Sequence, residues 1–274
     1  MNNLIKSVLF DAQTFTIPRL HVGLFLVSKY ASLARVVMSG HTGKLSAPWV
    51  TSGKVRLQCR SISDVGTAHA CLIDLANDLR AIQMHAPNLA IKNIVDVGAN
   101  IGQFWFAART LCPDARITSI EPNPASFASL HASAHSDPAA NLIMKGVGAS
   151  VGTMLFNIHP QLSSMSSFAA LADGIQAESQ IEVATMTLDY LPAERINLLK
   201  IDVEGWEMNV LNGAIQTLQR TDYILIEISL KRHADASNLD VLKLIVEACP
   251  KAEIISIGRS LAGAAQDFLI CTGS

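Results

Sequence analysis

The 274-residue sequence has little net charge, few aromatic residues and no closely spaced cysteines. Its formal net charge is only -2, so it lacks the strong field that attracts nucleic acid or an anionic lipid surface. Its five cysteines include no Cys-x-x-Cys pair, which excludes a zinc or dithiol centre built on that motif. We therefore expect no nucleic-acid partner, and a reducing compartment in which the cysteines stay free.

Long apolar runs and a cleavable leader are also missing. The longest apolar run lies around residues 23–27, far short of the roughly 20 residues that a membrane-spanning helix needs. No small-residue cleavage site of a secretory signal follows the N-terminus. The sequence therefore predicts a cytoplasmic protein without a membrane span.

The first 90 residues differ in pattern from the rest. Half of the whole chain is hydrophobic, enough for a sizeable core. Helical spacing occurs at residues 20–38 and 68–84, joined by an irregular connection at 39–53 that is rich in Gly, Ser, Thr and Pro, with a short strand expected at 54–59. We interpret residues 1–90 as a mainly helical cap.

From residue 91 to 274, short apolar runs alternate with helical stretches, which is typical of a parallel sheet with crossover helices. The expected strands are 93–98, 116–121, 142–147, 153–158, 181–187, 197–203, 223–230, 252–257 and 267–271. The expected helices are 102–111, 125–135, 206–218 and 239–248. A polar, serine-rich stretch breaks the alternation, so residues around 150–187 are predicted to form an insertion at the rim of the sheet.

The link between the last two predicted strands is too short for a crossover helix. The final strand should therefore run antiparallel to its predecessor. A mostly parallel sheet with one antiparallel C-terminal strand is the organisation of the class I methyltransferase fold, a Rossmann-like α/β fold. It differs from the all-parallel sheet of dinucleotide-binding proteins.

The first predicted strand runs into a turn that contains Gly98 and Gly102. Ligands of open α/β sheets bind beyond the carboxyl ends of the strands, and glycine lets ligand and backbone approach closely. Asp96 could accept a hydrogen bond from a bound ammonium group or order the turn itself. The turn is predicted to hold a cofactor, although a glycine that merely ends a strand gives the same pattern.

The next strand ends in a carboxylate, Glu121. A carboxylate there can accept hydrogen bonds from both hydroxyls of a ribose, so we predict that Glu121 anchors the ribose of the cofactor. The alternative is a solvated acid before a proline turn.

The same turn separates two classes of cofactor. Counting from Gly98, Asn100 and Gln103 occupy the second and third glycine positions of a dinucleotide fingerprint. The turn therefore lacks the glycines that let a pyrophosphate bind at the N-terminus of the following helix. S-adenosylmethionine has no phosphate and is favoured over a nicotinamide cofactor.

A third junction between a strand and a helix carries Asp202 and Glu204. Alternation along the strand would place both carboxylates on one side of its end. One of them could take a proton from an acceptor hydroxyl, or both could share a divalent metal ion. Alternatively, Glu204 and Glu207 only favour the N-terminus of the next helix. We predict that Asp202 and Glu204 are catalytic and leave the metal open.

Several ordered segments together closely resemble the FkbM-type methyltransferases. They are Val-Asp-Val-Gly-Ala-Asn-Ile-Gly-Gln (95–103), Glu-Pro-Asn-Pro (121–124), Thr-Leu-Asp (187–189), Leu-Lys-Ile-Asp-Val-Glu-Gly-Trp-Glu (199–207) and Leu-Asn-Gly-Ala (211–214). The resemblance covers roughly residues 90–230. It implies a class I fold, S-adenosylmethionine as donor, and O-methylation of a hydroxyl on a sugar, a glycolipid or a secondary metabolite.

The same resemblance implies a set of site residues. The residues that would line the cofactor site are Asp96, Gly98, Ala99, Asn100, Gly102, Glu121, Pro122 and Asn123, with Val147 and Gly148 near the adenine and Asp202 near the transferring methyl group. The acceptor would be a small molecule or a glycan. A nicotinamide oxidoreductase and a non-catalytic protein that kept the fold are the alternatives, and a homo-oligomer is compatible with the sequence.

Acceptor choice is expected to lie with residues 1–90 and the serine-rich insertion. Ser163, Ser164, Ser166 and Ser167 could contact a polar acceptor, but a solvated loop is the preferred interpretation. His233 follows a predicted strand and could act as a base, or be a plain loop histidine.

Overall fold

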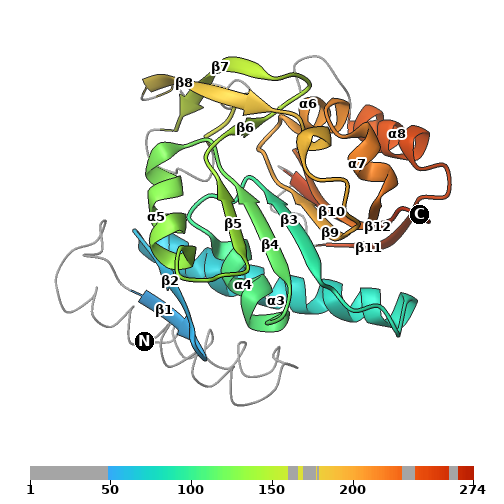
Figure 1. The fold of residues 1–274 in the computed structure, drawn as a ribbon, viewed down its shortest axis with the longest axis horizontal. Helices are drawn as coiled ribbons and strands as arrows, with labels where there is room; N and C mark the ends of the chain where they lie inside the picture. The colour runs from blue at the N-terminus through green and yellow to red at the C-terminus, as the bar shows by residue number, and fades with distance from the viewer. Residues whose placement is uncertain (1–48, 160–165, 169–176, 178, 230–237, 259–264) are drawn as a thin grey trace.

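A seven-stranded sheet forms the centre of the protein in the computed structural model, which describes residues 49–159, 166–168, 177, 179–229, 238–258 and 265–274 (Figure 1). The strand order is β11-β12-β10-β9-β3-β4-β5. The strands are β3 (Asn93–Val97), β4 (Arg116–Ile120), β5 (Ala140–Ile143), β9 (Ile196–Ile201), β10 (Thr221–Ser229), β11 (Glu253–Ile257) and β12 (Ala265–Cys271).

Strand direction fixes the place where a ligand can bind. Neighbouring strands from β5 to β10 pair in parallel, whereas β12 is antiparallel to both β10 and β11. The prediction of an antiparallel C-terminal strand is thus confirmed. From β3 the chain moves outward through β4 to β5 and then returns to β9 on the other side of β3. The carboxyl ends of β3 and β9 therefore form the switch point at which open α/β sheets bind ligands.

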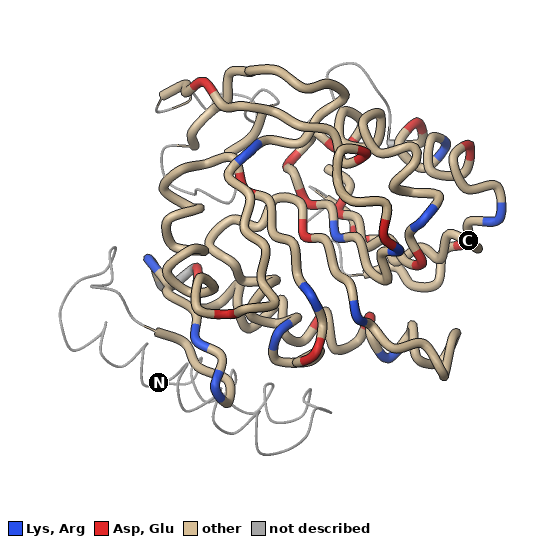
Figure 2. The backbone as a smooth tube through the Cα atoms, in the orientation of Figure 1, with Lys and Arg blue, Asp and Glu red and all other residues tan. Residues whose placement is uncertain are grey.

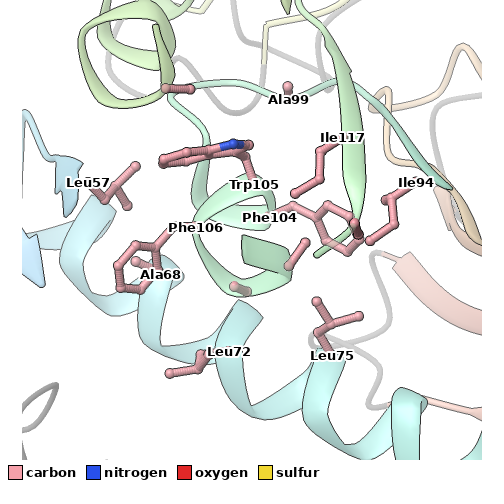
Figure 3. Close-up of a cluster of buried hydrophobic side chains, with 14 of the residues drawn as sticks. Leu57, Ala68, Leu72, Leu75, Ile94, Ala99, Phe104, Trp105, Phe106 and Ile117 are labelled. Atoms are coloured by element: carbon pink, nitrogen blue, oxygen red, sulfur yellow. The ribbon is translucent and has the colours of Figure 1, made fainter. Parts of the chain in front are cut away.

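Helices cover both faces of the sheet, and successive strand residues alternate between two cores. One core joins Ile94 of β3 to α3 (Ile62–His85), α4 (Gln103–Leu111) and α5 (Pro124–Ala134). The other joins Val95 to α6 (Glu207–Asn212), α7 (Ile215–Gln219) and α8 (Asn238–Ala248). Figure 3 shows Leu75 of α3 facing Phe104 of α4. Burying a side chain of this size stabilises the fold by roughly 1.5–3 kcal/mol.

The longest described helix, α3, has a clear start and stop. Ser61 caps its N-terminus by accepting a hydrogen bond from the Asp64 amide, and the Asp64 side chain accepts one from the Ser61 amide. The helix ends one residue before Ala86, which precedes a proline and so disfavours helical geometry. The helix predicted at 68–84 is confirmed and begins six residues earlier.

The described residues that precede α3, from Trp49 on, depart from the prediction at one strand. The segment expected to be irregular contains β1 (Trp49–Ser52), which pairs with β2 (Val55–Gln58) as an antiparallel hairpin, while the short strand expected at 54–59 is present. The helix predicted at 20–38 lies outside the described residues. The hairpin and α3 share their core with α4 and the central sheet. The division near residue 90 and the cap interpretation remain predictions.

Two further expectations are corrected. The strand predicted at 142–147 is split into β5 and β6 (Gly146–Val147), and β6 joins β7 (Gly152–Ile158) and β8 (Ser179–Met186) in a separate sheet of order β6-β8-β7. This small sheet lies beyond the carboxyl end of β5 (Figure 1).

The helix predicted at 206–218 is also split, into α6 and α7. The interruption is at Gly213, where a Cβ atom would lie only 2.1 Å from the Gly148 carbonyl oxygen. The 3₁₀ helix η2 (Leu188–Tyr190) packs beside α7. Within the described residues, no helix combines the length and the apolar character needed to cross a membrane.

Candidate functional site

The turn after β3 is built around two left-handed glycines, Gly98 and Gly102, with φ of 78° and 96°. A Cβ atom on Gly98 would lie 1.9 Å from the Asp202 carbonyl oxygen, so only glycine lets this turn touch the end of β9. The amides of Gly98 and Ala99 donate to the Ile120 carbonyl oxygen at 3.0 and 3.1 Å. The turn therefore connects β3, β4 and β9 at the switch point.

Glu121 lies at the end of β4 and is only 6 % exposed. One carboxylate oxygen accepts a hydrogen bond from the Asn100 amide at 2.7 Å, and the other accepts from the Asn123 amide at 2.8 Å. Burial raises the pKa of Glu121 to about 7, while the two backbone hydrogen bonds favour the ionised form. The alternative of a solvated acid is therefore wrong. Each oxygen keeps lone-pair capacity for a further donor.

Asn123 and Asn100 support this geometry. The Asn123 side chain accepts a hydrogen bond from the Ala125 amide at 3.0 Å and caps α5, with Pro124 in the first turn. Asn100 has a φ of 48°, a left-handed conformation that asparagine tolerates better than most residues. Its strained turn directs the Asn100 amide to Glu121.

The centre of the site is a buried lysine that the sequence analysis did not single out, Lys200 of β9. Its ammonium donates to the Gly98 carbonyl oxygen at 3.0 Å and lies 3.3 Å from a carboxylate oxygen of Asp96 and of Asp202. It also lies 5.7 Å from the centre of the Phe104 ring. Burial alone would lower the pKa of Lys200, but the Asp202 and Asp96 carboxylates outweigh it and raise that pKa.

Asp96 is completely buried beside Lys200, which favours the second of its two expected roles, the ordering of the turn, over direct contact with a bound ammonium group. Its carboxylate meets the ammonium of Lys200 and accepts a long hydrogen bond of 3.4 Å from Ser119. Burial raises the pKa of Asp96 and the Lys200 charge opposes this rise. Through Lys200, Asp96 orders the turn at Gly98.

Asp202 and Glu204 come together, but not through strand alternation. The strand β9 ends at Ile201, and Glu204 adopts a left-handed φ of 54°. The resulting loop, together with Glu227 of β10, brings three carboxylate oxygens within 4.8 Å of one another. The charge of Asp202, together with burial, raises the pKa of Glu227 well above its usual range. Glu227 was also missed by the sequence analysis.

An acid-lined hollow of about 120 Å³ lies beside these groups, between α3 and the sheet. The side chains that line it include Asp74, Asp78, Lys200, Asp202, Glu227 and Asp267. Burial raises the pKa of Asp78 to about 7 and that of Asp267 to about 6. Acidic positions from several elements gather in the middle of the molecule (Figure 2). The hollow therefore has room for a polar group next to Asp202.

Residues 96–250, which are 155 of the 274 residues, match the model of the Methyltransferase FkbM domain. The chain belongs to the FkbM methyltransferase family. It is an S-adenosylmethionine-dependent methyltransferase with the class I fold, whose strand order and antiparallel strand are those of the central sheet. Membership in this family overturns the alternative of a nicotinamide oxidoreductase. It agrees with the absence from the turn of the second and third glycines of the dinucleotide fingerprint.

Curated relatives of this FkbM methyltransferase include proteins from archaea, bacteria and fungi. The hexuronic acid methyltransferase AglP of Haloferax volcanii is 29% identical over 180 residues, which cover 64% of this chain and 68% of AglP. The 31-O-demethyl-FK506 methyltransferase FkbM of Streptomyces tacrolimicus is 31% identical over 166 residues, which cover 49% of this chain and 64% of that protein. Methyltransferase 1 of Beauveria bassiana is 30% identical over 142 residues, which cover 44% of this chain and 57% of that protein.

Solved structures are similar at much lower identity. The magnesium protoporphyrin IX methyltransferase ChlM from Synechocystis PCC 6803, with bound S-adenosylmethionine, matches with a TM-score of 0.45 and 9% identity, covering 90% of this chain and 96% of that one.

Residues 166–168, which lie in the stretch predicted to be a rim insertion, contact the loop after β9. Ser166 and Ser167 are buried, and the Ser167 hydroxyl donates to the Val203 carbonyl oxygen at 3.1 Å. Phe168 packs against Phe156 and Trp206. The interpretation as a solvated loop is therefore wrong for these two serines, while Ser163, Ser164 and His233 lie outside the described residues.

The residues expected near the adenine lie on the same side of the site. Val147 is buried in β6, and the Gly148 amide donates to the Met186 carbonyl oxygen at 3.0 Å. A Cβ atom on Gly148 would lie 3.6 Å from the indole nitrogen of Trp206. The structure thus brings Gly148 to the loop that follows Asp202.

Proposed function

We propose that this FkbM methyltransferase transfers a methyl group from S-adenosylmethionine to a hydroxyl oxygen of a sugar, a glycolipid or a secondary metabolite. The observation that carries this proposal is the pair of sites that flank the turn at Gly98: the Glu121 carboxylate on one side and the Lys200–Asp202 pair on the other. The relatives AglP and FkbM, a hexuronic acid methyltransferase and a 31-O-demethyl-FK506 methyltransferase, support the acceptor class.

The cofactor is assigned to the switch point. Glu121 would accept hydrogen bonds from the ribose hydroxyls with its remaining lone pairs, and the turn of Gly98, Ala99 and Asn100 would face the rest of the adenosyl group. Val147 and Gly148 would lie near the adenine, while Gly102, Pro122 and Asn123 would hold the walls. Asp96 would act indirectly, because it is buried behind Lys200.

The acceptor is assigned to the hollow beside Asp202. S-adenosylmethionine supplies an electrophilic methyl group on a sulfonium. The protein must align the acceptor oxygen with that group and remove one proton, and alignment can lower the barrier by about 7–11 kcal/mol. The Asp202 side chain is 36% exposed and ion-paired with Lys200, so an acceptor hydroxyl can reach it. It would accept the hydroxyl proton, with Glu204 beside it.

A divalent metal ion is the competing role for the same carboxylates. Asp202, Glu204 and Glu227 offer only oxygen ligands, which suit magnesium or calcium. Dialysis against EDTA separates the two roles. Activity that survives the removal of divalent ions supports Asp202 as the base, whereas activity that returns only with added magnesium supports a metal.

The decisive experiment follows product rather than binding. Purified protein is incubated with deuterium-labelled S-adenosylmethionine and a panel of neutral sugars, uronic acids and macrolides, and mass spectrometry detects the labelled methyl group. A labelled ether that is absent with Asp202→Asn supports the proposal. Cofactor binding without any labelled product from the panel or from cell extracts would favour the remaining alternative, a non-catalytic protein that kept the fold.

A further inference from the structure

A second group of metal-ligating side chains lies at the other end of the sheet from the cofactor site. His85 is the last residue of α3, Glu253 the first residue of β11, and Cys271 the last residue of β12. One ligand atom from each residue lies within 4.8 Å of the other two. We propose that these three residues, the His85 cluster, form a binding site for a divalent transition metal ion of the zinc class.

Strand register brings the cluster together. Cys271 is the register partner of Glu253 on one side and of Tyr223 on the other, so the three residues form one row across β11, β12 and β10. Register partners point to the same face of a sheet, and here α3 covers that face. Because α3 stops before Pro87, its last residue, His85, lies directly over the row.

A second observation supports a metal-binding role for His85. The Tyr223 hydroxyl lies 2.7 Å from Nδ1 of His85, and the two rings meet edge to face. Histidines that bind metal through one ring nitrogen usually donate a hydrogen bond from the other. A tyrosine hydroxyl can accept that bond, so Tyr223 fits the tautomer in which Nε2 has a free lone pair. In the structure Nε2 donates a hydrogen bond to the Glu253 carboxylate at 2.9 Å, and a metal ion bound between the two groups would replace the proton on Nε2.

The donor set selects the class of metal. One imidazole nitrogen, one thiolate and one carboxylate suit zinc or cobalt, whereas magnesium and calcium prefer oxygen alone. With zinc bonds of about 2.0–2.3 Å, tetrahedral ligand atoms lie roughly 3.3–3.8 Å apart. The His85 and Glu253 side chains are 35% and 60% exposed, so they can rotate by the ångström needed. The fourth ligand would be water, and binding would release the thiol proton.

Metal binding at this place would have a structural effect. The ion would join the C-terminus of α3 to the edge strand β11 and its neighbour β12, in place of the hydrogen bond between His85 and Glu253. The same helix forms one wall of the acid-lined hollow, through residues such as Cys71 and Asp74. The proposal does not depend on the methyl-transfer reaction.

Cobalt titration of the metal-free full chain tests the site. We expect one Co²⁺ per chain, with a sulfur-to-cobalt charge-transfer band in the near ultraviolet that zinc abolishes by competition. The band should disappear in Cys271→Ser and persist in Cys112→Ser, a matched cysteine outside the cluster. The variant Tyr223→Phe should retain the band but bind cobalt about 10–100-fold more weakly, because it loses the hydrogen bond to the ligating histidine.

Exposed positions keep the test valid if Cys271→Ser does not fold. Glu253→Gln and His85→Gln change accessible side chains and should each weaken cobalt binding at least tenfold, while His131→Asn, on α5, should not. Melting temperature should rise on adding zinc to the wild type and not to His85→Gln. The proposal is overturned if wild-type protein binds no cobalt, if the bound cobalt shows no thiolate band, or if the band survives in Cys271→Ser.

Discussion

Replacing Lys200 with methionine should destabilise the protein in a pH-dependent way. Methionine retains most of the buried aliphatic stem but removes the ammonium that faces Asp96 and Asp202. Asp96 is fully buried, so it is left as an unpaired carboxylate, and breaking a buried pair in this way costs about 3–5 kcal/mol. A domain with a total stability of about 5–15 kcal/mol would lose a large part of it.

The pH dependence follows from the pKa of Asp96. Burial raises this pKa, and in Lys200→Met the lysine charge no longer opposes the rise. A carboxyl with a raised folded-state pKa favours folding below its unfolded pKa of about 3.9, and this contribution is lost as pH rises to the folded pKa. The stability difference between wild type and variant should therefore be smaller at pH 5 than at pH 8, because pH 5 lies closer to the unfolded pKa.

Urea denaturation at both pH values measures the effect. The urea concentration at the midpoint should be much lower for the variant than for the wild type at pH 8, and the difference should be partly recovered at pH 5. Lys92→Met is the matched control, because Lys92 forms only an exposed pair with Asp114 at 4.0 Å, worth less than about 1 kcal/mol. Lys200→Met combined with Asp96→Asn should recover part of the lost stability. A loss that is equal at both pH values would refute the assigned charge pairing.

Three other predictions concern the proposed site. Glu121→Gln should weaken S-adenosylmethionine binding by about 1.5–3 kcal/mol in calorimetry, and unchanged affinity would remove its proposed role. The affinity of the wild type should rise between pH 6 and 8, because the Glu121 carboxyl, with a pKa of about 7, accepts ribose hydrogen bonds better when it is ionised. Gly98→Ala should lower the melting temperature strongly, since the added Cβ would overlap the Asp202 carbonyl. The control Gly66→Ala, in a helix with open space around it, should stabilise the protein by about 0.4–1 kcal/mol. Equal effects of the two substitutions would contradict the close contact between Gly98 and the Asp202 carbonyl. Asp202→Asn should reduce kcat by roughly 10²–10⁴-fold and change the cofactor Kd by less than tenfold, and a fully active variant would exclude Asp202 as base or essential ligand.

Local sequence pattern predicted the parts of the fold that depend on local chemistry. The apolar runs that became β3, β4 and β10 were predicted within a few residues, because a strand buried on both faces is apolar throughout. The break between α6 and α7 was missed, since it arises where Gly213 meets the Gly148 carbonyl, a contact between distant segments. The turn at Gly98 and the buried Glu121 could be predicted because each follows a strand directly.

The charged residues that were missed left a readable signal. Lys200 and Glu227 each lie between apolar neighbours in their strands, and a buried charge in such a place requires a partner. Their partners could not be predicted, because the pairing depends on which strands become neighbours. The sequence predicted that Asp202 and Glu204 would meet, yet by the wrong route: a left-handed loop conformation replaces strand alternation.

The contact between residues 166–168, in the predicted rim insertion, and the loop after β9 constrains the design of chimaeras. Ser167 holds the Val203 carbonyl, and Phe168 fills the space between Phe156 and Trp206. A graft that exchanges the insertion with that of a relative must carry residues 166–168 and 203–206 as one unit. Exchanging either segment alone would leave Phe168 or Trp206 without the other ring to pack against, and would shift the backbone that carries Asp202.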